Sequence, residues 1–127
     1  MNLAVDTNAL SDFFKEAPDI VLSIKNSSKI YVSVTVIGEY KYGIYGGSRK
    51  KNNLNLLSKF LAKPNVIILE INDETAEQYA RLRAYLRVNG TPIPVNDLWI
   101  AALCVQYDLP LLTRDGDFKH LPQVHLI

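Results

Sequence analysis

Short apolar runs alternate along the chain with longer segments in which apolar residues recur at helical spacing. The apolar runs have the length and composition of β-strands and lie at residues 3–5, 30–34, 66–71, 109–113 and 124–127. The segments between them predict helices at residues 8–14, 18–24, 36–45, 50–62, 72–88 and 96–105. Strands that alternate with helices are typical of an α/β fold. We therefore expect a central, mostly parallel sheet of about five short strands, with helices on both faces.

The helix predicted at residues 96–105 has no polar face. Residues 98–105 are apolar on every side of a helical wheel, which indicates a helix inside the protein. Its first residues are nevertheless Asn96 and Asp97. Both residue types are favoured as helix caps, where they accept hydrogen bonds from free N–H groups at the positive end of the helix dipole. At this point capping and a functional role for Asp97 are both open.

Composition limits the class of protein. The chain has 127 residues, of which 48% are hydrophobic, and this predicts one domain over residues 1–127 with a substantial core. A formal net charge of +1 argues against strong electrostatic capture of nucleic acid by the whole molecule, although a local basic rim remains compatible with it. The single cysteine, Cys104, excludes an internal disulfide. With no transmembrane run and no signal-like N-terminus, we expect a cytoplasmic protein.

Acidic residues follow several of the predicted strands. Asp6 comes directly after the first strand, Glu39 lies a few residues after the second, and Asp97 opens the buried helix. Asp115 and Asp117 follow the fourth strand. Because ligands of open α/β sheets bind outside the carboxyl ends of the strands, we expect these acids to share one cleft. In contrast, Glu70 lies within a strand, and we expect Asp12 and Asp19 to be solvated acids outside the site.

Several carboxylates in one cleft require a cation. Two like charges about 4 Å apart repel each other by on the order of 4 kcal/mol at an effective dielectric constant near 20. The candidate ligands are all oxygens, since no histidine or cysteine stands at ligand spacing, and oxygen ligands favour Mg²⁺ or Mn²⁺ over zinc. Such ions activate water and support in-line displacement at phosphorus. The acidic set therefore indicates phosphodiester hydrolysis.

The acidic motifs, taken together, carry a family resemblance. The chain contains, in order, VDTNAL, SVTVIGEYKYG, PVNDLWIAALC and LLTRDGDF. This series resembles the successive motifs of PIN-domain ribonucleases, and the length and strand order resemble the VapC-like toxins of type II toxin–antitoxin systems. The resemblance implies a PIN-like three-layer sandwich and a Mg²⁺-dependent endoribonuclease that hydrolyses RNA with metal-activated water. It also implies a homodimer and a small cognate VapB-like antitoxin that occludes the acidic site.

The resemblance assigns roles residue by residue. It makes Asp6, Glu39, Asp97 and Asp115 the catalytic acids, and it places Asp6, Asp97, Asp115 and Asp117 at the metal. Asp117, directly before Phe118, is held in reserve as an alternative fourth acid. The supporting residues are expected to be Thr7 and Asn8, which would orient Asp6, together with Asn96 and Thr113. The residues expected to hold substrate phosphates at the rim are Arg49, Lys50, Lys51, Arg114 and Lys119.

Two other interpretations are compatible with parts of the pattern. Phosphatases that resemble the haloacid dehalogenases share the fold class, but they begin with Asp-x-Asp, and here the second position is Asn8. A catalytically inactive PIN-like module that only binds RNA or a partner is the other alternative. The intact set of acids argues against it, because inactive members would be expected to lose them.

Overall fold

Four short parallel strands form the centre of the protein. The computed structural model describes residues 1–127. The sheet has the strand order β3-β2-β1-β4, and all of its pairings are parallel. Its strands are β1 (Asn2–Val5), β2 (Lys29–Ser33), β3 (Val66–Leu69) and β4 (Leu111–Leu112). Parallel pairing brings the carboxyl ends of all four strands to one edge of the sheet.

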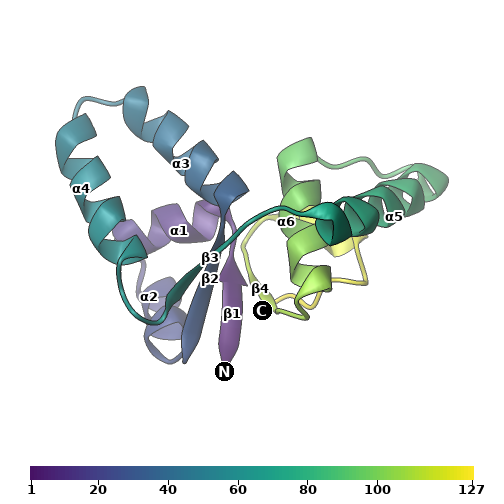
Figure 1. The fold of residues 1–127 in the computed structure, drawn as a ribbon, viewed down its shortest axis with the longest axis horizontal. Helices are drawn as coiled ribbons and strands as arrows, with labels where there is room; N and C mark the ends of the chain where they lie inside the picture. Colours follow the sequence, from purple (N-terminus) through teal and green to yellow (C-terminus); the bar gives the residue numbers. More distant parts are fainter.

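Helices cover both sides of the sheet. Figure 1 shows the first four helices on one side of the strands and the last two on the other. The predicted α/β class with three layers is therefore confirmed. The helices are α1 (Thr7–Phe14), α2 (Pro18–Lys25), α3 (Val34–Tyr45), α4 (Lys50–Leu61), α5 (Asp73–Asn89) and α6 (Val95–Gln106), and a short 3₁₀ helix, η1 (Gly116–His120), follows β4. None of these helices is long and apolar enough to span a membrane.

The predicted fifth strand is reduced to one bridge. Leu126 pairs with Leu111 in a single parallel bridge, in which the Leu111 N–H donates to the His125 carbonyl at 2.8 Å. The neighbouring strand β4 has only two residues. Pro110 before it has no N–H to donate to a longer ladder. Too little of β4 is left to pair a full strand, so the sheet has four strands rather than about five.

Helix α6 is buried, as its apolar sequence predicts. It contributes six residues to a core cluster of 30 buried hydrophobic residues. Its start differs from the expected one: the N-cap is Pro94, and no side chain caps the helix. The explanation of Asn96 and Asp97 as caps is therefore wrong, because the helix begins at Val95 and both residues lie within its first turn. Asp97 still lies near the positive end of the helix dipole.

Gly90 ends α5 and starts the loop that leads to α6. Its φ of +66° lies in the left-handed region, where a side chain costs about 1–2 kcal/mol. Gly46 occupies the matching position after α3 but has a φ of −82°, and a Cβ there would meet its nearest atom, the Gly43 carbonyl oxygen, at 3.7 Å.

These two glycines give a matched test of stability. Gly90→Ala should lower the free energy of unfolding by about 1 kcal/mol, because alanine disfavours positive φ. Gly46→Ala should leave it unchanged or raise it slightly, because alanine restricts the unfolded chain without strain in the native state. Urea denaturation of both variants measures the difference, and equal effects at the two positions would contradict the assignment.

Candidate metal centre

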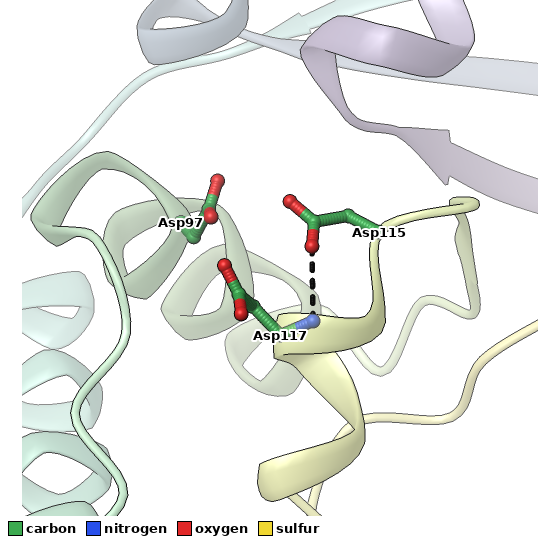
Figure 2. Close-up of side chains that lie close together, drawn as sticks. All are labelled: Asp97, Asp115 and Asp117. Carbon is green, nitrogen blue, oxygen red and sulfur yellow. Dashed lines mark hydrogen bonds between the residues drawn. The ribbon is translucent and has the colours of Figure 1, made fainter.

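Three carboxylates meet at the edge of the sheet where the strands end. One oxygen from each of Asp97, Asp115 and Asp117 lies within 4.8 Å of the others, and all three residues are half-buried. Figure 2 shows Asp97, from the first turn of α6, facing Asp115 and Asp117 at the start of η1. Asp115 also caps η1, since its Oδ1 accepts a hydrogen bond from the Asp117 N–H at 2.9 Å. The structure thus places Asp117, the reserve candidate, beside Asp97 and Asp115.

Asp6 is held differently from these three acids. It follows β1, is 3% exposed, and caps α1 by accepting a hydrogen bond from the Ala9 N–H at 2.8 Å. Its other oxygen accepts a hydrogen bond from the Thr113 hydroxyl. Both oxygens therefore have partners within the chain. Asp6 lies close enough to the cluster to feel the charge of Asp115, but it is not one of the three acids whose oxygens converge.

Thr113 connects Asp6 to the acidic loop. Its hydroxyl donates to Asp6 Oδ2 and accepts a hydrogen bond from the Asp115 N–H at 2.9 Å. One side chain thereby fixes the end of β1 relative to the segment that carries two of the clustered acids. Hydrogen bonds of this kind orient metal-ligating carboxylates in proteins.

Glu39 is oriented by Thr7. It lies in α3, half-buried, and its Oε1 accepts a hydrogen bond from the Thr7 hydroxyl at 2.7 Å. Thr7 was expected to orient Asp6, but its hydroxyl is bonded to Glu39 instead, because Thr7 begins α1 and points across to α3. Asn8 and Asn96, the other expected supporting residues, are exposed, and neither side chain is hydrogen-bonded to a site acid.

Burial and neighbouring charges raise the pKa values of Asp97 and Asp6. Burial raises the pKa of Asp97 to about 7, with further contributions from the charges of Asp115, Glu39, Asp6 and Asp117. Burial also raises the pKa of Asp6, against hydrogen bonds from Thr113 and Ala9 that lower it. All five acids therefore contribute to one electrostatic unit, although only three converge. Converging oxygen ligands under mutual repulsion fit a divalent cation such as Mg²⁺ or Mn²⁺.

The basic residues expected to hold substrate phosphates differ in how free their side chains are to do so. Arg114 is paired with Asp12 and Asp19 on the neighbouring helices, so its guanidinium would have to leave these acids to hold a phosphate. The sequence shows no sign of these pairs, because 102 and 95 residues separate the partners. Lys50 lies over the Tyr45 ring, 5.1 Å from its centroid. Arg49, Lys51 and Lys119 are exposed.

Comparison with known proteins identifies the family. A family model described as the PIN domain matches residues 3–124. The chain belongs to the PIN-domain family. Ribonuclease VapC4 of Mycobacterium tuberculosis is 32% identical over 96 residues, which cover 76% of this chain and 74% of that protein. The resemblance to VapC-like PIN domains is thus confirmed.

Solved structures of PIN-domain proteins share the fold. The VapBC2 complex of Rickettsia felis, bound to a DNA fragment from its promoter, superposes with a TM-score of 0.86 at 28% identity. That match covers 100% of this chain and 98% of the other. The FitAcB structure of Neisseria gonorrhoeae has a TM-score of 0.77 at 25% identity, over 100% of this chain and 96% of that one.

The raised pKa of Asp97 predicts a pH-dependent stability in this PIN domain without metal. A folded-state pKa of about 7 exceeds the value of about 3.9 expected in the unfolded chain. The carboxyl therefore contributes stability that is fully present below about pH 4 and is lost as pH rises through about 7. Asp97→Asn removes the charge, so in chelator at pH 8 the variant should be about 1 kcal/mol more stable than wild type and melt about 4 °C higher.

Melting curves in chelator at pH 5 and pH 8 measure this effect. The advantage of Asp97→Asn should shrink at pH 5, where the folded wild type carries a neutral carboxyl. Asp108→Asn, which changes an exposed acid, serves as the control and should show no such trend. A variant less stable than wild type at pH 8 would mean that repulsion does not dominate at Asp97.

Proposed function

We propose that this PIN domain is a divalent-metal-dependent endoribonuclease and the toxin of a type II toxin–antitoxin pair. The observation that carries the proposal is the convergence of Asp97, Asp115 and Asp117 at the carboxyl edge of the sheet. Asp6 and Glu39 raise the pKa of Asp97 and so lie within electrostatic reach. Relatives that share the family are named ribonucleases. A strongly acidic edge in a ribonuclease fold is best explained by a metal-assisted reaction.

The site residues have different roles in the proposed reaction. Asp97, Asp115 and Asp117 would hold Mg²⁺, with Mn²⁺ as the alternative ion. When bound, such an ion supplies Lewis acidity toward water and toward the phosphoryl oxygens of the substrate. Glu39 has one oxygen held by Thr7, and its other oxygen, Oε2, would take up the proton of the attacking water as the bond from phosphorus to the leaving ribose oxygen breaks. The leaving oxygen would take a proton from solvent. The hydrogen bond between Asp6 and Thr113 fixes the start of α1 relative to the segment that carries Asp115 and Asp117.

A cognate antitoxin follows from the same charges. The structures of related proteins include toxin–antitoxin complexes. An acidic cluster that requires a cation is also a natural binding site for an arginine, whose guanidinium can donate two hydrogen bonds to carboxylate oxygens. We infer that a small VapB-like antitoxin inhibits by placing a basic segment at the cluster. The homodimer stays a prediction that light scattering can test.

A module that binds RNA without cutting it is less consistent with this site. RNA carries one negative charge per phosphate, and a cluster of carboxylates repels it unless a cation lies between them. A binding module would gain affinity by losing these acids. The chain keeps all of them, together with the hydrogen bonds that orient Asp6, Glu39 and Asp115.

Substitution of the site acids tests the nuclease proposal. Glu39→Gln, Asp97→Asn and Asp115→Asn should each reduce Mg²⁺-dependent cleavage of a fluorescent RNA by at least about 10²-fold, as expected when a group that acts in the transition state is removed. Asp6→Asn should reduce it by a similar factor, because Asp6 accepts the Thr113 hydrogen bond that positions the clustered acids. Asp117→Asn should have a similar effect, because its oxygen converges with those of Asp97 and Asp115.

Glu70→Gln is the control for charge. Glu70 is exposed beyond the end of β3, so this variant should cut RNA at the wild-type rate. Circular dichroism should show that every variant is folded. Full activity in Asp97→Asn or Asp115→Asn would exclude the proposed metal centre. Equal cleavage by the wild type with and without chelator would exclude a metal-dependent reaction.

The inhibition proposal is tested on the complex. Replacing each arginine or lysine in the C-terminal segment of the antitoxin by alanine should restore RNA cleavage by at least about tenfold, since one lost charge-assisted pair is worth about 1.5–3 kcal/mol. The complex itself should persist in size-exclusion chromatography. Inhibition that survives every such substitution would show that the antitoxin acts elsewhere than at the acidic cluster.

A further inference from the structure

A recess lies beside the candidate metal centre, between α1, α3 and α4. These three helices lie on the same side of the sheet (Figure 1). The recess has a volume of about 390 Å³, and polar residues make up most of its lining. They include Asn8, Ser11, Lys15, Glu39 and Asn53. Glu39 also raises the pKa of Asp97, so the recess and the metal centre share one acid.

Apart from Thr7 and Glu39, which are bonded to each other, the polar side chains of this recess have no hydrogen-bond or ion-pair partner within the chain. Asn8 and Ser11 share one face of α1, and Lys15, the C-cap residue of that helix, follows four residues later on the same side. Asn53 faces them from α4, half-buried. The hydrogen bonds and ion pairs of the protein involve none of the side chains of Ser11, Lys15 and Asn53. Amide, hydroxyl and ammonium groups are thus left available to a ligand.

We propose that this recess binds the base of the RNA nucleotide next to the phosphate that is cleaved, and that Ser11 and Asn53 select that base. The inference rests on the proposed nuclease function. Its location follows from Glu39, which belongs to both the recess and the acidic edge. A nucleotide whose phosphate lies at Asp97 and Asp115 would place its neighbouring base beyond Glu39.

The chemistry of the lining fits a base better than a phosphate. An asparagine amide and a serine hydroxyl both donate and accept hydrogen bonds, and this matches the mixed donors and acceptors on base edges. A phosphate would meet a single cation, Lys15, and would be repelled by Glu39. The volume falls within the range of about 300–1,000 Å³ that is usual for ligand sites.

The surface continues from the recess toward exposed aromatic residues. Gly43 lines the recess and also an adjoining depression that contains Tyr42 and Tyr45. Tyr42 is 83% exposed and Tyr45 is 58% exposed. Bases of single-stranded RNA stack on such side chains. An RNA chain that leaves the recess past Gly43 would therefore meet Tyr42 and Tyr45, on which its next bases can stack. This supports single-stranded RNA as the ligand.

The test is the sequence preference of cleavage. Wild type, Asn53→Ala and Ser11→Ala are given single-stranded RNA oligonucleotides that differ only in the nucleotides beside the cleaved bond. Each variant should lose about tenfold in preference for the best base at one position, because its hydrogen bond to that base is gone. Asn55→Ala, an exposed position on the same helix, is the matched control and should keep the wild-type preference.

Substitutions at Lys15 and Gly43 test whether the recess holds a base or a phosphate, and whether RNA occupies it. Lys15→Gln should weaken RNA binding modestly and shift the base preference; uniform weakening on all sequences would mean that the recess holds a phosphate and would overturn the proposal. Gly43→Leu fills space in which an added Cβ meets no heavy atom within 4 Å, so it should fold, melt no lower than wild type and bind RNA at least fivefold more weakly. Gly43→Ala should bind more nearly as wild type does.

A binding measurement keeps this test independent of cleavage. Fluorescence anisotropy with the same oligonucleotides in chelator reports the base preference even when no RNA is cut. If wild type never cuts RNA but Asn53→Ala still loses base-selective binding, the nuclease proposal fails and the recess assignment stands. If Asn53→Ala and Ser11→Ala match Asn55→Ala in both cleavage and binding, the recess assignment is overturned whether or not RNA is cut.

Discussion

The mutual repulsion of carboxylates is the constraint on which the rest of this structure depends. Asp97, Asp115 and Asp117 bring oxygens within 4.8 Å of one another, and burial together with neighbouring charges raises the pKa of Asp97 to about 7. The fold resists this repulsion by fixing each acid to a rigid element. Asp97 is carried by α6, whose buried residues form part of the core, and Asp115 is held by backbone and hydroxyl groups at η1. The acids therefore cannot easily move apart, and their repulsion is relieved either by protonation of Asp97 or by a bound cation.

Asp6 has a different role from the acids that converge, and burial explains why. A carboxylate that is 3% exposed is stable only if its oxygens accept hydrogen bonds, and those of Asp6 are used by the Ala9 N–H and the Thr113 hydroxyl. The second bond joins residues 107 positions apart in the chain. Asp6 thus links the first strand to the loop after the last one. Removing its charge would disturb the geometry of the cluster even though Asp6 is not among its converging ligands.

The sequence predicts the parts of this protein that follow from local pattern. The apolar residues 98–105 predict a buried helix, and acids placed after strands predict a common edge, because parallel strands end together. Contacts between segments that are distant in the chain could not be predicted from the sequence. No local pattern shows that Thr7 would bond to Glu39 rather than orient Asp6, that Arg114 would pair with Asp12 and Asp19, or that α6 would begin at Val95 after Pro94. The choice between Asp115 and Asp117 also depended on the turn into η1, which brings both acids to Asp97.

The local charge of the site also bears on the proposed function, in which a nearly neutral protein acts on RNA. The chain has a formal net charge of +1, so attraction of the whole molecule for RNA is weak and binding must come from local contacts. At the acidic edge such contacts are repulsive until a cation arrives, whereas the recess between α1, α3 and α4 offers neutral hydrogen-bonding groups at all times. The proposed function therefore separates affinity from chemistry in space: the recess and the exposed tyrosines would hold bases without metal, and the cluster would accept a phosphate only once its charge is neutralised. An arginine placed at the cluster by a partner satisfies the same electrostatic demand without supplying Lewis acidity, so it would stop the chemistry and leave the recess open.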